Sequence, residues 1–307
     1  MNKLLFTIAM AGIMLSANAQ TLIKGNFKKG DTMTYVTTQE NVIGGQGQSL
    51  TTKINSEIQY TILDANDKSA SVECLIKVFD FSNEGMDQAS EAMDEVSQLT
   101  AKLKDFPIIV ELDENGAPKG IANRDKVEEK VNTIINEFVD NILKMAPQMS
   151  EMMSKETLVQ QMKSKLSEEE ILNSVTDGVF DLYGKTISNG YEDEKEENGI
   201  RLKQTYTIAN IFGTQNVTVK GVSNMNKDDV KSMFFKQIEQ AGLPEDQVSM
   251  IKQNYGQLEA AGMAKLEVNS NETYQMDKDS WLKGLKSTSD VNLFGQNIKE
   301  TKSINRK

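Results

Sequence analysis

Two blocks of alternating apolar and polar residues, one near each end of the chain, predict antiparallel strands. In the first block, between residues 31 and 78, apolar residues fall on every second position, which is the period of a half-buried strand. Turn-forming runs at 44–47 and 64–67 divide the block into three strands, so we expect a meander with one apolar face. The apolar positions are Met33, Tyr35, Leu50, Ile54, Ile58, Tyr60, Ile62, Val72, Cys74, Ile76 and Val78.

The longest amphipathic pattern follows a short apolar strand at 107–112 and a turn at 113–116. Its apolar residues recur in steps of three and four, which is typical of one face of a helix. Asn123 suits the N-cap of this helix, and Pro147 removes a backbone donor and is expected to end or kink it. The apolar positions are Val127, Val131, Ile134, Ile135, Phe138, Ile142, Met145, Met149 and Met152.

The remaining patterns predict more helices and a second set of strands. A helix over 86–103 is expected before the long one, and Ser167 and Glu170 form a capping-box pattern for a helix that continues towards Tyr183. The acidic run 192–197 is interpreted as a solvated loop, since a cation site there is less favoured. Strands over 200–219, two helices over 226–255 and a final meander over 266–304 complete the chain.

This order of elements favours an α+β fold. We expect a curved antiparallel sheet, an open half-barrel, with helices packed on its concave face. Residues 20–307 are expected to form a single domain, because no long linker rich in Pro, Gly or Ser divides them. A subdivision near 184–199 is the alternative.

The first 19 residues have the features of a signal peptide. Lys3 gives a positive start, residues 4–15 are apolar, and small residues up to Ala19 fit cleavage before Gln20. We expect an exported protein, periplasmic or extracellular after cleavage, with no transmembrane segment in the mature chain. The net charge of −11 disfavours nucleic acid as a partner, because phosphate backbones are bound by clustered Lys and Arg.

The chain has no histidine and a single cysteine, Cys74. This composition excludes Ser-His-Asp and Cys-His catalysis and histidine-ligated zinc, so we predict no enzyme activity, no cofactor and no metal site. Cys74 lies on the apolar face of its strand and is interpreted as a small buried side chain rather than a reactive thiol. The calcium-loop fragment at 113–116 lacks the remaining ligands of that motif, which favours a hairpin turn.

A cavity between the curved sheet and the methionine-rich helix is the candidate ligand site. Flexible methionines adapt to irregular apolar ligands, and such a cavity can hold an acyl chain. In the alternative, the helices fill the concavity and leave no space. The residues expected to line the cavity are Ile134, Phe138, Ile142, Met145, Met149 and Met152.

Short motifs carry two resemblances. The run 27–32 before the first strands, and the strand-turn 111–116 before 121–123, resemble an uncharacterised group of exported bacterial proteins known only as domains of unknown function. The order of strands and helices is similar to that of periplasmic lipoprotein carriers, whose open half-barrel is covered by helices. This second likeness is an analogy of fold and implies no catalytic residues.

Three functional hypotheses follow. The leading one is a non-enzymatic exported protein that binds a hydrophobic or lipid-like ligand between sheet and helices. The alternative is a cell-envelope module for protein–protein interaction with a solid core. The third is a histidine-independent carboxylate hydrolase, which requires two acidic residues that converge in a cleft.

Overall fold

The computed structural model describes residues 20–45, 48–84, 101–145, 153–164, 166–197, 199–211, 214–240, 245–260, 264–293 and 295–307. The predicted signal peptide, most of the helix expected over 86–103, and Pro147 lie outside these ranges. The strands are β1 (Thr21–Leu22), β2 (Thr32–Gly45), β3 (Gln48–Ala65), β4 (Ser69–Glu84), β5 (Ile108–Asp113), β6 (Pro118–Ile121), β7 (Thr186–Ile187), β8 (Glu192–Glu197), β9 (Ile200–Ile211), β10 (Thr214–Ser223), β11 (Leu266–Met276), β12 (Leu282–Leu293) and β13 (Gln296–Arg306). The helices are α3 (Arg124–Met145), α5 (Lys155–Ser164), α6 (Glu168–Thr176), α7 (Lys227–Gln240) and α8 (Glu245–Ala260).

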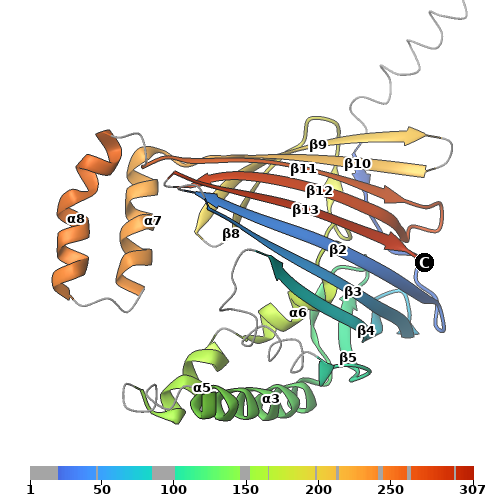
Figure 1. The fold of residues 1–307 in the computed structure, drawn as a ribbon. Coiled ribbons are helices and arrows are strands. Elements are labelled where there is room, and N and C mark those ends of the chain that lie inside the picture. Colours follow the sequence, from blue (N-terminus) through green and yellow to red (C-terminus); the bar gives the residue numbers. More distant parts are fainter. Residues whose placement is uncertain are drawn as a thin grey trace, which may run out of the picture.

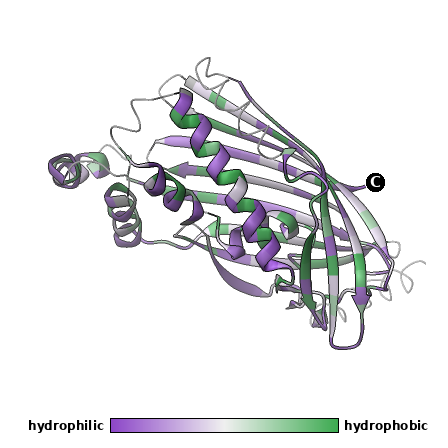
Figure 2. Cartoon of the chain, turned by 90° about the horizontal axis from the view of Figure 1, so that it is seen from below, coloured by the Kyte–Doolittle hydropathy of each residue, from purple (hydrophilic) through white to green (hydrophobic). Residues whose placement is uncertain are grey.

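Eleven strands form one open antiparallel sheet, in the order β6-β5-β4-β3-β2-β13-β12-β11-β10-β9-β8. The first long strand, β2, pairs with the last, β13, so the two predicted meanders join at the centre of the sheet. Figure 1 shows the sheet curving over α3, α5 and α6, and Figure 2 shows α3 crossing it. The predicted fold class, a curved open antiparallel sheet with helices on its concave face, is therefore confirmed.

The alternation of the strands produces the core. Side chains that alternate along β3 and β4 point to the covered face, and Tyr60, Val72 and Cys74 are each at most 2% exposed. Burial raises the pKa of the Cys74 thiol, so it stays protonated near neutral pH. The interpretation of Cys74 as a small buried side chain is confirmed.

The chain that connects the two edge strands, β6 and β8, crosses the concave face of the sheet. We call its last part, residues 168–187, the strap; it contains α6 and β7. Tyr60 Oη donates a hydrogen bond of 2.9 Å to the Val175 carbonyl of the strap. The Phe180 ring lies 5.6 Å from the Tyr60 ring and is 1% exposed. Aromatic packing of this kind fills the space between the strap and the centre of the sheet.

Two local predictions are wrong. The helix expected to reach Tyr183 is α6, which begins at its Ser167 cap but ends at Thr176. Gly178 then adopts φ +81°, a conformation that ends a helix and that glycine adopts without strain. The acidic run expected to be a loop is the edge strand β8, whose backbone pairs with β9 while Glu192, Glu194 and Glu196 are exposed.

Helices α7 and α8 form a hairpin inserted between β10 and β11, as the sequence predicts. Asn226 caps α7, since its Oδ1 accepts hydrogen bonds from the amides of Asp228 and Asp229. Figure 1 shows the hairpin beyond the ends of the strands. None of the helices that the structure describes is both long and apolar enough to cross a membrane.

Candidate functional site

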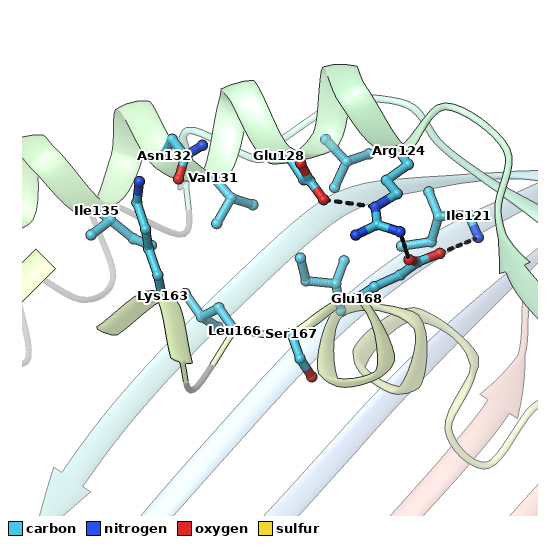
Figure 3. A pocket seen from close by; sticks show the side chains of 12 residues that line it. Ile121, Arg124, Glu128, Val131, Asn132, Ile135, Lys163, Leu166, Ser167 and Glu168 are labelled. Atoms are coloured by element: carbon cyan, nitrogen blue, oxygen red, sulfur yellow. Dashed lines mark hydrogen bonds and ion pairs between the residues drawn. The ribbon is translucent and has the colours of Figure 1, made fainter. Parts of the chain in front are cut away.

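A cleft of about 400 Å³ lies between α3, the end of α5 and the start of α6. Figure 3 shows its side chains converging from the two sides. Half of the lining is apolar and half is polar or charged, so the cleft is amphipathic. The lining residues are Ile121, Arg124, Val127, Glu128, Val131, Asn132, Ile135, Lys163, Leu166, Ser167, Glu168 and Ile171.

One face of α3 supplies the apolar wall of the cleft. Val127, Val131 and Ile135 are spaced by four residues, so they lie above one another on the helix. Asn123 fixes the start of α3: its Oδ1 accepts from the Ile109 amide at 2.9 Å, and its Nδ2 donates to the Pro107 carbonyl at 2.8 Å. Asn123 therefore holds the predicted N-cap position, but its side chain binds the β5 region instead of helix amides.

A network of charged groups ties α3 to α6 at one end of the cleft. Arg124 Nε donates to Glu128 Oε1 at 2.7 Å, and its Nη1 lies 2.9 Å from Glu168 Oε2. The other oxygen of Glu168 accepts from the Ile121 amide at 3.3 Å. These carboxylates raise the pKa of Arg124. We call Arg124, Glu128 and Glu168 the brace, because it links two helices and β6.

The sequence places the site on a different stretch of the same helix. Ile134, Phe138 and Ile142 are half-buried on α3 and are not among the residues that line the cleft. The side chain of Met145, and Met149 and Met152 as a whole, fall outside the described part of the chain. A cavity formed by these six residues therefore stays a prediction.

The cleft residues that the sequence pattern does not assign to the site lie on β6, on α3 and on the stretch from the end of α5 into α6. Val127, Val131 and Ile135 belong to the recognised helical pattern, so the signal for them was present. Ile171 belongs to the predicted helix that begins after Ser167, but only the placement of α6 across the cleft from α3 brings Ile171 and Leu166 to the site. The brace was equally invisible, since Arg124 and Glu168 are far apart in the sequence.

A second group of interacting polar side chains joins the strap to the sheet. Tyr274 Oη lies 2.7 Å from Glu272 Oε2 and 3.2 Å from Asp181 Oδ2. Burial, reinforced by the neighbouring Asp177 carboxylate, raises the pKa of Asp181 from 3.8 to about 6. Asp177 itself pairs with Lys302 of β13. We call Asp181, Glu272 and Tyr274 the carboxyl triad.

The number of protons shared by Tyr274, Asp181 and Glu272 decides which hydrogen bonds the carboxyl triad can form. Burial also raises the pKa of Tyr274, so its hydroxyl keeps its proton. One hydroxyl hydrogen serves one carboxylate, so the second contact is complete only when Asp181 carries a proton of its own. Within the residues described, no group of three or more Cys, Asp or Glu side chains has an arrangement suited to a metal ion.

Comparison with known proteins assigns no family. No family model matches the chain, and no curated protein matches it. Among solved structures, one titled "Lipid-protein interactions in lipovitellin" matches with a TM-score of 0.42 at 10% identity. That match covers 92% of this chain, which spans 25% of the lipovitellin chain.

An outer membrane channel from Pseudomonas putida F1 also matches, with a TM-score of 0.24 and 7% identity. The match covers 92% of this chain and 98% of the channel. Similarity this low assigns neither a family nor a function. The resemblance to exported domains of unknown function and to lipoprotein carriers accordingly stays a prediction.

Proposed function

We propose that the protein is a non-enzymatic binding protein that takes a hydrophobic, lipid-like ligand into the cleft between α3 and α6. The observation that carries the proposal is a cleft whose apolar lining is only partly covered, because Val127 and Ile135 are buried but Leu166, Val131 and Ile171 are not. Leu166 at the cleft is 42% exposed, and Val131 on the opposite side, on α3, is only half-buried. The volume of about 400 Å³ lies within the range of roughly 300–1,000 Å³ found for small-molecule sites.

The energetics favour an occupant. Apolar surface left in water costs about 25 cal/mol per Å², so two amphipathic helices ordinarily close on each other. Here the brace of Arg124 and Glu168 spans from α3 to α6 and sets the distance between the helices at that end. A ligand that covers Val131, Leu166 and Ile171 gains the burial that the helices do not provide for themselves.

The absence of catalytic chemistry in the cleft supports a binding role. The chain contains no histidine, and the carboxylates lining the cleft are the two that bind Arg124. Asp181 and Glu272 do converge, as a carboxylate hydrolase requires, but they lie in the triad and not in the cleft lining. A substrate in the cleft therefore meets no free pair of acidic groups.

A specific observation favours the second candidate, a protein–protein interaction module. Tyr35, Tyr60, Phe180 and Trp281 are each at most 2% exposed, so the strap fills the centre of the concavity. The α7–α8 hairpin stands beyond the strands, and Met250 on it is 57% exposed. This candidate requires binding of a protein partner that is independent of the cleft.

Export is part of the proposal and rests on the sequence of residues 1–19. Processing before Gln20 would leave the cleft and the sheet intact, because every described element begins after that residue. Amino-terminal sequencing of the protein recovered from an expressing bacterium tests this directly. A mature chain that still begins at Met1 contradicts it.

Binding is tested by native mass spectrometry with lipid extraction, followed by titration with a fluorescent fatty acid. The cleft variant is Leu166→Glu, which places a charge at an exposed apolar position and should leave the fold unchanged. The matched control is Lys126→Glu, at an exposed position of α3 outside the cleft lining. We expect saturable binding that Leu166→Glu weakens at least about tenfold and Lys126→Glu leaves unchanged, since tenfold corresponds to about 1.4 kcal/mol.

A further inference from the structure

The two ends of the cleft carry different charged groups. This difference determines which ligand head group can bind at each end. Figure 3 places the brace of Arg124, Glu128 and Glu168 at one end and Lys163 with Asn132 at the other. Val131 lies between them. A ligand that lies along the cleft therefore meets two different polar environments separated by an apolar stretch.

The groups of the brace are already paired. Arg124 donates to one carboxylate at 2.7 Å and lies 2.9 Å from the second, so its charge is balanced by two acids. Glu168 also accepts from the Ile121 amide. A cationic ligand group at this end would have to compete with a guanidinium that is held in place, and an anionic one would meet two carboxylates. The brace therefore favours neither a cationic nor an anionic ligand group, and it closes that end of the cleft.

Lys163 offers the opposite situation. Its side chain is exposed, and among the residues that the structure describes no ion pair or hydrogen bond involves its ammonium group. Asn132 also lines the cleft, and Figure 3 draws its side-chain amide at the same end as Lys163. An ammonium group brings three donors and an amide two more, so this end is rich in donors.

The overall acidity of the protein does not cancel this local preference. The net charge of −11 is spread over 307 residues, and charges farther than about 8–10 Å are largely screened at physiological salt. Contacts at hydrogen-bond distance decide which head group stays. Charge-assisted hydrogen bonds from Lys to a carboxylate or phosphate are roughly twice as strong as neutral ones.

We infer that the cleft binds a single-chain amphiphile with an anionic head group. The head group binds Lys163 and Asn132, and the acyl chain lies over Val131 towards Ile171, with the brace limiting the length that fits. This inference rests on the proposed function and adds the ligand class to it. The shared chemistry is a carboxylate or phosphate on an aliphatic chain.

The test compares four ligands that share one chain and differ only in the head group: laurate, dodecyl phosphate, dodecanol and dodecylamine. Each displaces a fluorescent fatty acid from the purified protein below its aggregation concentration. We expect laurate or dodecyl phosphate to bind about tenfold more tightly than dodecanol, as one charge-assisted hydrogen bond implies. Tighter binding of laurate identifies a carboxylate head group, and tighter binding of dodecyl phosphate identifies a phosphate head group.

The matched variants are Lys163→Gln and Lys126→Gln, both at exposed positions. Lys163→Gln should remove the preference for the anion while dodecanol binds as before, and Lys126→Gln should change neither value. Equal binding of laurate and dodecanol to the wild type, or tightest binding of dodecylamine, overturns the inference and leaves the proposed function standing. If none of the four ligands binds, the proposed function itself fails.

Discussion

Replacement of Asp181 by Asn tests how the strap is held on the sheet. Asp181 Oδ1 accepts from the Gly178 amide at 3.0 Å, and its other oxygen contacts Tyr274 Oη at 3.2 Å. An asparagine keeps the shape of the side chain, accepts from Gly178 and donates to Tyr274 at any pH. The wild-type carboxyl can accept from Gly178 and also donate to Tyr274 only when it is protonated.

The sign and size of the effect follow from the pKa. Asp181 has a pKa of about 6 in the folded protein against 3.8 for an ordinary aspartate, so the folded state binds the proton more tightly. Its contribution to stability is complete below about pH 3.8 and is lost as the pH rises through about 6. Because Asp181 is also exposed to solvent, screening reduces the effect of this pKa difference, and we expect it to contribute about 1 kcal/mol to the unfolding free energy.

The groups that face Asp181 come from three elements, and none of them reverses this sign. Asp177 in the strap and Glu272 on β11 both favour the protonated form, whereas Lys302 on β13 and the Gly178 amide oppose it. Burial has the largest effect. Since Asp177 already pairs with Lys302, that lysine is not free to neutralise Asp181 fully.

The assay is urea unfolding followed by fluorescence of Trp281, the single tryptophan, which is buried in the core. We expect Asp181→Asn to be as stable as the wild type near about pH 4 and more stable by about 1 kcal/mol near about pH 7.5. Asp279→Asn, at an exposed aspartate, is the control and should show no such change. A stability difference that is the same at both pH values would show that ionisation of Asp181 does not weaken the attachment of the strap.

Three further predictions concern the strap and the core. Tyr60→Phe leaves the buried Val175 carbonyl without its 2.9 Å hydrogen bond and should cost about 1–3 kcal/mol of unfolding free energy; no change would mean that the contact is not formed. Gly178→Ala introduces a Cβ at φ +81° and 2.4 Å from Ile304 Cδ1, so it should lower stability by more than about 1 kcal/mol, and an unchanged thermal midpoint would argue against this backbone geometry. Cys74 should react with a thiol reagent only after unfolding, and rapid reaction of the native protein would show that it is accessible.

The sequence was sufficient for the sheet because the period of two is a local signal. Tyr60, Val72 and Cys74 each follow it, and each is buried. The end of α6 was missed because Val179 continues the helical spacing while Gly178, which stops the helix, is a weak signal within it. The acidic strand β8 was missed because charge predicts exposure, and an edge strand is exposed as well.

The site was harder to predict because its parts are distant in sequence. The helical period of α3 runs along its whole length, so it does not distinguish Val131 from Phe138 as the ligand-facing position. That choice depends on where α6 packs, which in turn depends on Tyr60 and the strap. The contact between Arg124 and Glu168 appears only once those elements are in place.

One titration shows whether the space between α3 and α6 holds an amphiphile. A fluorescent fatty acid is added to the wild type, to Leu166→Glu and to Lys126→Glu, with the thermal midpoint of each protein measured alongside. We expect saturable binding to a single site in the wild type and the control, and binding at least about tenfold weaker in Leu166→Glu at an unchanged thermal midpoint. Equal binding by all three proteins, or no saturable binding by any of them, would contradict the proposed binding.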